Sequence, residues 1–597
     1  MLAEMPQDQH GQGMSGGVAS GGPHTAIFDN QHRPITAGGF VTSGPIVFEN
    51  VAEQAGLTGW RHKSGTPEQP LILEAMSGGV CLLDYDNDGW LDIFMVNGST
   101  LDALNGKATP PRAALFRNNR DGTFTDIAIH AGVTNDRWGF GCTVGDFNND
   151  GWPDIYVTNY GKNRLYRNNH DGTFTDVAEQ AGVALDSWST GATFGDYDGD
   201  GNLDLFVSCY IDLDLKDTSA SSNGVSDYDF CEYRGAKVMC GPRGLKGARN
   251  HLYHNNGDGT FADVSSKLGI STHTYYSLGA LFADVNNDGK PDLLVANDST
   301  PNDLYINKGN GTFENDSYMN GYAVNGDGRE MANMGIAAGD YLNNGNLDIV
   351  NTTFADDYDV LFQNDGHGNF TDVSYPAGIA EPSLPFVGFG DGFIDYDNDG
   401  WLDLFITNGH LYPQVDQHPQ WGESYAQRPL LYHNLKNGNF ALVPAVEGTG
   451  LATVCVGRGA AFGDLFNSGK IDVIMNPLVG VPVLLRNVNP DHNHWVKIKL
   501  VGGPKSPRDA VGSTVYLIAG GIRRRQDVLS GGSYLSSNDF RVHFGLGQLK
   551  KVDQVRIHWP SGDVENVALP AVDRIYTITE GKGITDSMCA GLPCKQS

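Results

Sequence analysis

One nine-residue unit, D-x-[DN]-x-D-G-x-x-D, recurs along most of this chain and constrains its fold more than any other feature. Near-intact copies begin at Asp84, Asp146, Asp196, Asp284 and Asp395. Weaker copies are DYLNNGNLD and DLFNSGKID, which begin at Asp340 and Asp464. In chain order we number them loops one to seven. A unit repeated at such intervals predicts a repeat architecture, in which each copy marks one supersecondary unit.

Strand and hairpin patterns follow each acidic unit. Short apolar runs such as Ile93–Val96 and Leu404–Ile406 come directly after it, and runs of this kind are typical of strands buried on both faces. A second motif then recurs, [LI]-[FY]-x-N with a Gly turn and an aromatic residue, as in LYRNNHDGTF at Leu165. Its Asn/Asp-Gly tips indicate hairpins. Together the patterns predict an all-β fold, a seven-bladed β-propeller with four strands per blade.

The two ends of the repeat region are complementary. The seventh repeat has a third strand near 484–487 but no fourth strand after it. An orphan segment at 46–52, IVFENVA, is similar to FTDVAEQAGV at Phe174. We therefore expect the N-terminal strand to complete the last blade and close the ring, which removes exposed sheet edges.

Charge and hydropathy exclude some classes of protein. The chain has 40 Lys and Arg against 71 Asp and Glu, a formal charge of −31, which opposes binding to nucleic-acid phosphates or anionic lipids. Runs of ~18 apolar residues are absent, so no membrane-spanning helix is expected. The first 44 residues lack the apolar stretch of a secretory signal, so we expect either a cytosolic protein or a mature chain whose signal has been removed.

The acidic loops offer oxygen ligands in a fixed order. Side-chain oxygens at positions 1, 3 and 5, a backbone carbonyl at position 7 and a carboxylate at position 9 form an oxygen-only cage. Ca²⁺ takes 6–8 oxygens at ~2.3–2.6 Å, so the five near-intact loops predict about five Ca²⁺ ions. The expected ligands are Asp84, Asp86, Asp88, Trp90 and Asp92; Asp146, Asn148, Asp150, Trp152 and Asp154; Asp196, Asp198, Asp200, Asn202 and Asp204; Asp284, Asn286, Asp288, Lys290 and Asp292; Asp395, Asp397, Asp399, Trp401 and Asp403.

Loops five and seven depart from this pattern. Leu342 stands at position 3 of loop five, and Phe466 and Ser468 stand at positions 3 and 5 of loop seven. We expect these loops to bind metal weakly or not at all; their candidate ligands are Asp340, Asn344, Asp348, Asp464 and Asp472. The alternative for any single copy is an ordinary solvated turn rich in Asp and Gly.

Bound cations would also reduce the electrostatic repulsion between the carboxylates of each loop. Several carboxylates within a few Å repel one another, and a divalent ion removes that repulsion and couples folding to its own concentration. Millimolar free Ca²⁺ is an extracellular condition. The loops therefore favour a secreted, periplasmic or cell-surface protein.

The acidic loops and the LYRN…GTF strands resemble the FG-GAP/VCBS repeats of integrin-α-type seven-bladed propellers. Four further motifs resemble the ASPIC/UnbV domain of CRTAC-like proteins: NHWVKIKLVG at Asn493, RDAVGSTVYL at Arg508, GGSYLSSNDFRVHFGLG at Gly531 and WPSG at Trp559. The resemblance implies a calcium-binding recognition protein. UnbV-type relatives in enediyne biosynthetic clusters suggest an enzyme as the alternative.

We expect four segments. Residues 1–44 are a flexible Gly/Ser/His-rich tail, 45–490 the propeller, 491–583 a small β-sandwich, and 584–597 a C-terminal tail. The close pairs Cys231/Cys240 and Cys589/Cys594 suggest small disulfide loops, with isolated thiols as the alternative.

Catalytic motifs are weak. GMSGG at Gly13 fits G-x-S-x-G but has neither the preceding strand nor the following helix of a nucleophile elbow. His62, His410 and Arg458 lie beside inner-strand segments, where the mouth of the central channel is expected. They form either a transition-metal or substrate-polarising site or a set of satisfied structural side chains.

Two insertions, 209–250 and 408–429, carry aromatic residues that suit recognition or simply pack within their own loops. The leading hypothesis is a secreted calcium-binding β-propeller for extracellular recognition or adhesion, with a protein or carbohydrate ligand and no nucleic acid. The rival is a metal- or cofactor-dependent enzyme that acts at the channel mouth. The oligomeric state stays open.

Overall fold

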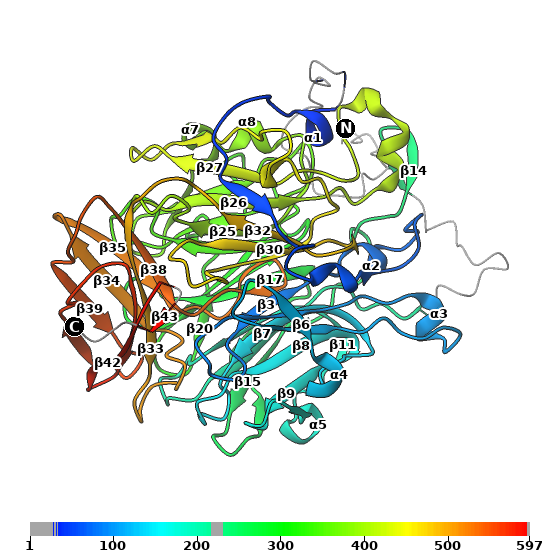
Figure 1. Ribbon diagram of the computed structural model, residues 1–597. Coiled ribbons are helices and arrows are strands. Elements are labelled where there is room, and N and C mark those ends of the chain that lie inside the picture. Colours follow the sequence, from blue (N-terminus) through cyan, green and yellow to red (C-terminus); the bar gives the residue numbers. More distant parts are fainter. Residues whose placement is uncertain are drawn as a thin grey trace, which may run out of the picture.

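Four-stranded antiparallel sheets make up most of this computed structural model, which describes residues 28, 32, 34–215, 231–270, 272–590 and 592–593 (Figure 1). The same strand order recurs in units that start at β3, β7, β11, β17, β21, β25 and β29. The first strands of successive units contact one another, and β29 contacts β3, so the units form a closed ring. The expected all-β propeller architecture is confirmed.

The strand bounds show how the acidic loops fit into this ring. In every unit the ninth residue of the loop begins the second strand, so each loop joins the first strand to the second. The strands are β3 Val80–Leu83, β4 Asp92–Met95, β5 Ala114–Asn118, β6 Phe124–Asp126; β7 Trp138–Gly145, β8 Asp154–Lys162, β9 Arg164–Asn168, β10 Phe174–Asp176; β11 Asp186–Gly195, β12 Asp204–Cys209, β15 His251–Asn255, β16 Phe261–Asp263; β17 Ser277–Ala283, β18 Asp292–Asn297, β19 Asp303–Asn307, β20 Phe313–Asn315; β21 Ile336–Gly339, β22 Asp348–Asn351, β23 Val360–Asn364, β24 Phe370–Asp372; β25 Gly388–Ile394, β26 Asp403–Asn408, β27 Leu430–Asn434, β28 Phe440–Leu442; β29 Gly459–Gly463, β30 Asp472–Asn476 and β32 Val483–Asn487.

Each α-helix in the described part of the chain is four residues long. Among the described residues, none is long and apolar enough to cross a membrane. They are α1 Ile35–Gly38, α2 Ile72–Ala75, α3 Leu101–Leu104, α4 Ala128–Ala131, α5 Ala178–Ala181, α7 Ser374–Ala377 and α8 Ala380–Ser383, with 3₁₀ turns η1 Leu57–Gly59, η2 Pro413–Gln417, η3 Pro419–Trp421 and η4 Gly450–Ala452.

An N-terminal strand completes the last unit, as the orphan segments predicted. Strand β1 (Phe48–Asn50) pairs antiparallel with β32, and Phe48 lies opposite Asn487. Phe48 is fully buried and its ring contacts Phe405 edge-on. Two distant parts of the chain therefore share one sheet, which leaves the ring without a break at the chain terminus.

Part of the expected N-terminal tail is ordered. The backbone N–H of Val41 donates to Ala445 at 2.9 Å, and Thr36, which is fully buried, accepts from the N–H of Arg428 at 3.2 Å. The flexible segment predicted over 1–44 is therefore wrong for 34–44, because this stretch supplies hydrogen-bond partners to the sixth unit. Residues 1–27 lie outside the described part of the chain.

In two disulfides, both cysteines belong to the described residues. Cys81 on β3 is bonded to Cys142 on β7, which joins neighbouring inner strands across 61 residues of sequence. Cys231 and Cys240 bracket a small hairpin of β13 (Cys231–Tyr233) and β14 (Ala236–Val238), as their spacing suggested. Cys589 is also disulfide-bonded, whereas its expected partner Cys594 lies outside the described residues.

The C-terminal region folds into two facing sheets beside the propeller (Figure 1). One sheet has the order β38-β33-β41-β42-β43 and the other β35-β34-β39-β40. The strands are β33 His494–Val501, β34 Thr514–Ala519, β35 Ile522–Asp527, β38 Val542–Gly547, β39 Gln554–His558, β40 Val564–Val567, β41 Arg574–Thr579, β42 Gly583–Cys589 and β43 Leu592–Pro593. The predicted C-terminal tail from residue 584 is wrong here, because β42 pairs with β41 along its length.

A loop of this C-terminal domain enters the centre of the ring. Strands β36 (Gly532–Ser533) and β37 (Ser536–Ser537) contact inner strands of several units, and β37 pairs with β3. Between them, Tyr534 is fully buried and donates to the carbonyl of Met76 at 2.8 Å. The loop therefore fills the central channel, and we call residues 530–538 the plug.

One asparagine in each unit links adjacent acidic loops. The side-chain amide of Asn434, for example, donates to the carbonyl of Leu402 in its own loop at 2.9 Å and to Tyr341 in the preceding loop at 2.8 Å. Equivalent pairs of hydrogen bonds occur at every unit, including the junction of the last unit with the first. The bridging residues are Asn118, Asn168, Asn255, Asn307, Asn364, Asn434 and Asn487.

Asn434→Ala should lower the free energy of unfolding by about 2–4 kcal/mol, because two buried carbonyls lose their donor. Denaturant unfolding at fixed Ca²⁺ measures the change. Asn437→Ala, at an exposed hairpin tip, is the matched control and should cost below about 1 kcal/mol. Equal losses in the two variants would contradict the bridging role.

Candidate metal centres in the acidic loops

The first aspartate shapes each loop. In loop two, one carboxylate oxygen of Asp146 accepts from the N–H of Asp150 at 3.0 Å, and the other accepts from Gly151 at 2.6 Å. The backbone at Asn149 is left-handed, with φ of 57°, which turns the chain sharply between these groups. The same pair of hydrogen bonds recurs in the other six loops.

The ninth residue of each loop begins the second strand, and its carboxylate is the last predicted oxygen ligand of the loop. Asp154 is fully buried, and one of its oxygens accepts from the N–H of Asn168 at 2.7 Å. The other oxygen is buried without a hydrogen-bond partner in the described part of the protein, as is one oxygen of Asp86 in loop one. Orphaned carboxylate oxygens are costly unless a cation is close. The residues present therefore fit a hard divalent ion.

Three loops bring carboxylates close enough to share one ion. In each of them, oxygens of three residues lie within 4.8 Å of one another. The groups are Asp84, Asp86 and Asp92; Asp196, Asp198 and Asp204; Asp395, Asp397 and Asp399. Loops two and four have Asn148 and Asn286 at position 3, whose amide oxygens accept from Asp150 and Asp288.

The residues at position 7 lie where the motif predicts a carbonyl ligand. Their backbone N–H groups donate to the fifth residue of the same loop, as Trp152 does to Asp150 at 3.0 Å. The same bond occurs at Trp90, Asn202, Lys290 and Trp401. Coordination by their carbonyls stays a prediction.

Burial dominates the electrostatics of these loops. It raises the pKa of Asp92 and Asp154 well above the ordinary value, and neighbouring carboxylates raise it further. In loop six, burial raises the pKa of Asp403 to about 7. The ionised form is therefore unfavourable without a cation, which is the condition under which metal binding contributes folding free energy.

Arginines of the C-terminal domain cover loop five. Arg523 donates to the carbonyl of Asn344 at 2.8 Å, and Arg525 donates to Gly345 at 3.0 Å. Burial raises the pKa of Asp340 to about 6, and both arginines oppose that shift. Because Leu342 packs into an apolar cluster, loop five has fewer oxygen ligands. The positively charged guanidinium groups of Arg523 and Arg525 lie against this loop instead.

A lysine of the C-terminal domain occupies the acidic side of loop seven. The ammonium of Lys497 lies 3.3 Å from Asp464 and 3.8 Å from Asp539, and its side chain is fully buried. Lys497 also opposes the burial that raises the pKa of Asp472. This loop, which lacks acidic residues at positions 3 and 5, therefore has a built-in cation.

Lys497→Met should lower the free energy of unfolding by about 3–5 kcal/mol, because the buried carboxylate of Asp464 loses its nearest ammonium group. Urea unfolding measures the loss, and added Ca²⁺ should restore part of it. Lys499→Met is the control: Lys499 is 41% exposed and lies 3.6 Å from Asp84, so removing it should cost below about 1 kcal/mol. If Lys497→Met lowers the free energy of unfolding no more than Lys499→Met does, Lys497 does not take the place of a metal ion in loop seven.

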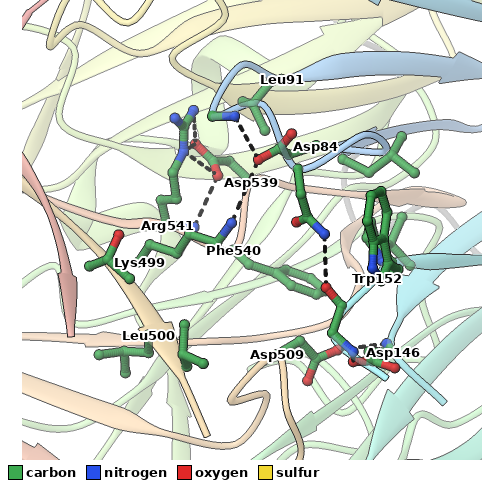
Figure 2. A pocket seen from close by; sticks show the side chains of 18 of the residues that line it. Asp84, Leu91, Asp146, Trp152, Lys499, Leu500, Asp509, Asp539, Phe540 and Arg541 are labelled. Atoms are coloured by element: carbon green, nitrogen blue, oxygen red, sulfur yellow. Dashed lines mark hydrogen bonds and ion pairs between the residues drawn. The ribbon is translucent and has the colours of Figure 1, made fainter. Parts of the chain in front are cut away.

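A cavity of about 400 Å³ lies between loops one and two and the C-terminal domain (Figure 2). Asp84 and Trp152 line it from the propeller, and Lys499 and Asp509 line it from the C-terminal domain. Asp509 accepts from the backbone N–H of Asp146 at 2.8 Å. The C-terminal domain therefore adds a carboxylate directly to the edge of loop two.

At the predicted channel mouth, His62 has a structural role, whereas Nε2 of His410 is buried without a hydrogen-bond partner among the described residues and lies 3.6 Å from Glu423. His62 is buried with both ring nitrogens engaged: Nδ1 contacts the carbonyl of Leu478, and Nε2 accepts from Gly98 at 3.1 Å. Burial lowers the pKa of His62 to about 4 and that of His410 to about 3. A transition-metal site that includes His62 is therefore wrong, since this side chain has no free nitrogen.

Arg458 ties this region together. Its guanidinium donates to the carbonyls of Ala75 at 2.7 Å and Gly409 at 2.9 Å, and it stacks over the ring of Phe389 at 4.0 Å. Among the described residues, all acceptors of its side-chain hydrogen bonds are backbone carbonyls. Arg458 therefore joins chain segments at the mouth instead of facing a substrate.

The two insertions contact each other. Tyr233 donates to Glu423 at 3.0 Å, and Arg234 lies 3.0 Å from the same carboxylate. Tyr233 also packs edge-on against Trp421. The aromatic residues at 408–429 thus pack against the segment at 231–240, which the sequence could not show because residues so distant in the chain carry no pairing signal.

Sequence reasoning missed two histidines at the acidic loops. His254 groups with Asp198 and Asp200, and His433 groups with Asp397 and Asp403, in each case within 4.8 Å. Both occupy the variable position of the [LI]-[FY]-x-N motif, in LYHNN and LYHNL. A comparison of that position between repeats would have found them.

Comparisons with known proteins agree with the repeat pattern. The FG-GAP-like repeat family model matches residues 84–157, 146–207, 240–295 and 284–351, and the ASPIC and UnbV model matches 503–585. Cartilage acidic protein 1 of Homo sapiens is 23% identical over 522 residues, which cover 84% of this chain and 62% of the relative. The Mus musculus protein is 25% identical over 306 residues, which cover 50% of this chain and 44% of the relative. The chain thus spans less than two thirds of these relatives.

Solved structures show weaker similarity. An Agrocybe aegerita lectin that recognises non-reducing terminal N-acetylglucosamine is 16% identical, with a TM-score of 0.36 and coverage of 68% of this chain and 86% of the lectin. Rhamnogalacturonan lyase YesW is 11% identical, with a TM-score of 0.34 and coverage of 70% of this chain and 73% of the lyase.

Proposed function

Because this chain is an FG-GAP-repeat protein with an ASPIC/UnbV domain, homologous to cartilage acidic protein 1, we propose that it is a calcium-stabilised extracellular recognition or adhesion protein. The observation that carries the proposal is the repeated oxygen-only loop, in which buried carboxylates such as Asp154 keep an unpartnered oxygen. Ca²⁺ supplies the missing positive charge when bound. The ring and its loops then form a rigid scaffold for a binding surface.

The loops also hold the C-terminal domain. Arg524 donates to the carbonyl of Gly400 in loop six at 3.1 Å, and the N–H of Arg508 donates to Asn149 in loop two at 2.9 Å. These contacts depend on the shape of each loop, and ion binding fixes that shape. Ca²⁺ therefore stabilises the docking of the two domains as well as the blades.

Two features support the proposed location outside the cell: a disulfide and the negative net charge. The disulfide between Cys81 and Cys142 suits an oxidising compartment, and the formal charge of −31 calls for abundant divalent cation. A secreted, periplasmic or cell-surface setting provides both conditions.

We propose a protein or carbohydrate partner, and no nucleic acid, because net negative charge disfavours phosphate ligands. Tyr318 and Met319 are 65% and 85% exposed and offer one apolar contact area on the fourth unit. The rival, an enzyme of UnbV type at the channel mouth, is less well supported, because His62, His410 and Arg458 are buried from solvent.

Metal removal tests the proposal. We expect about five Ca²⁺ per chain by elemental analysis, and each site should contribute about 2.7 kcal/mol at a hundredfold excess over Kd, so excess EDTA should lower the melting temperature. Asp86→Ala should reproduce part of this loss. Asp121→Ala, at an exposed hairpin turn, is the matched control and should leave the Ca²⁺ count unchanged. An unchanged transition in EDTA, or zinc as the main metal, would reject calcium stabilisation.

A further inference from the structure

An imidazole nitrogen reaches the carboxylates of loops three and six. Nδ1 of His254 lies 3.2 Å from Asp204 and 3.3 Å from Asp198. Nδ1 of His433 lies 3.1 Å from Asp403 and 3.8 Å from Asp397. The two loops therefore differ from an oxygen-only cage, and we call them the imidazole loops.

The sequence position explains why the ring faces the cage. His254 immediately precedes Asn255, whose backbone N–H donates to Asp204 at 2.8 Å, and His433 has the same relation to Asn434 and Asp403. Strand pairing therefore places this residue beside the ninth aspartate in every unit. The corresponding residues in the other units are Arg117, Arg167, Ile306, Gln363 and Arg486, none of which offers a neutral nitrogen ligand.

Packing holds both rings in the same way. The imidazole of His254 meets Tyr197 edge-on at 6.2 Å, and that of His433 meets Tyr396 edge-on at 5.9 Å. Nδ1 of His254 is buried and has no hydrogen-bond partner of acceptable geometry among the described residues. Nδ1 of His433 differs, because it lies within hydrogen-bond distance of Asp403 at 3.1 Å and of the Tyr396 hydroxyl at 3.4 Å. An imidazole nitrogen that faces two carboxylates at each of two loops, and is unsatisfied at one of them, points to a shared ligand.

We propose that the imidazole loops bind a first-row transition-metal dication, such as Zn²⁺, through Nδ1 and the adjacent carboxylates. Zn²⁺ takes nitrogen and oxygen ligands at ~2.0–2.2 Å, and two such ligands on one ion lie about 3.2–3.5 Å apart. The distances of 3.2 and 3.3 Å from Nδ1 in loop three lie in this range, and those of 3.1 and 3.8 Å in loop six lie on either side of it. Ca²⁺ prefers oxygen alone, whereas imidazole suits Zn, Cu, Fe and Ni. The inference rests on the proposed role of the loops as metal sites: loops three and six take Ca²⁺ when it is the sole metal and prefer Zn²⁺ when both are present, whereas loops one, two and four prefer Ca²⁺.

Zinc titration of the metal-free full chain tests this assignment. With Zn²⁺ alone as the probe, calorimetry should show two tight sites, and His254→Gln and His433→Gln should each weaken one of them by roughly tenfold or more. Co²⁺ should give visible absorption from the wild type that the double variant loses. His170→Gln is the matched control, because His170 contacts Asp150 of loop two at 2.8 Å from an exposed hairpin.

Calcium counts separate this inference from the proposed function. In Ca²⁺ alone, both histidine variants should keep about five ions and the melting temperature of the wild type. If the wild type and both variants bind zinc with equal affinity, the proposal that the imidazole loops bind zinc is wrong, while calcium stabilisation is unaffected. Failure to bind Ca²⁺ at all would reject the proposed function, whatever zinc does.

Discussion

The side-chain amide of one asparagine per unit is the interaction on which the rest of this structure depends. Each amide donates to the loop of its own unit and to the loop of the unit before it, as Asn168 does to Pro153 and Tyr85. The last link, from Asn118 to Leu465, joins the first unit to the seventh. Since the acceptors are loop carbonyls, the same hydrogen bonds close the ring and fix the shape of the acidic loops.

Loop shape creates a concentrated negative charge, and the protein compensates it in more than one way. Loop seven uses the buried ammonium of Lys497, and loop five lies under Arg523 and Arg525. In the remaining loops burial also raises the pKa of carboxylates, as at Asp154, and a bound cation would stabilise their ionised form. Basic side chains of the C-terminal domain therefore balance part of the negative charge of the propeller loops.

The plug gives the same domain a second role. Ser530 accepts from Phe194 and donates to Val144, and Tyr534 packs edge-on against Phe389 in the centre of the ring. The propeller channel is thus filled by protein, and the C-terminal domain contacts both the acidic loops and the inner strands.

The sequence alone determined the repeats, the loop chemistry and the closing strand, because these depend on local spacing: a D-x-D-x-D-G turn or a strand motif is recognisable wherever it occurs. It could not place Lys497 at a loop, pair Cys81 with Cys142, or show that His62 has no free nitrogen. Those facts depend on residues distant in the chain. Only the tertiary structure brings them together, since ring closure and domain docking decide which side chains share a buried space.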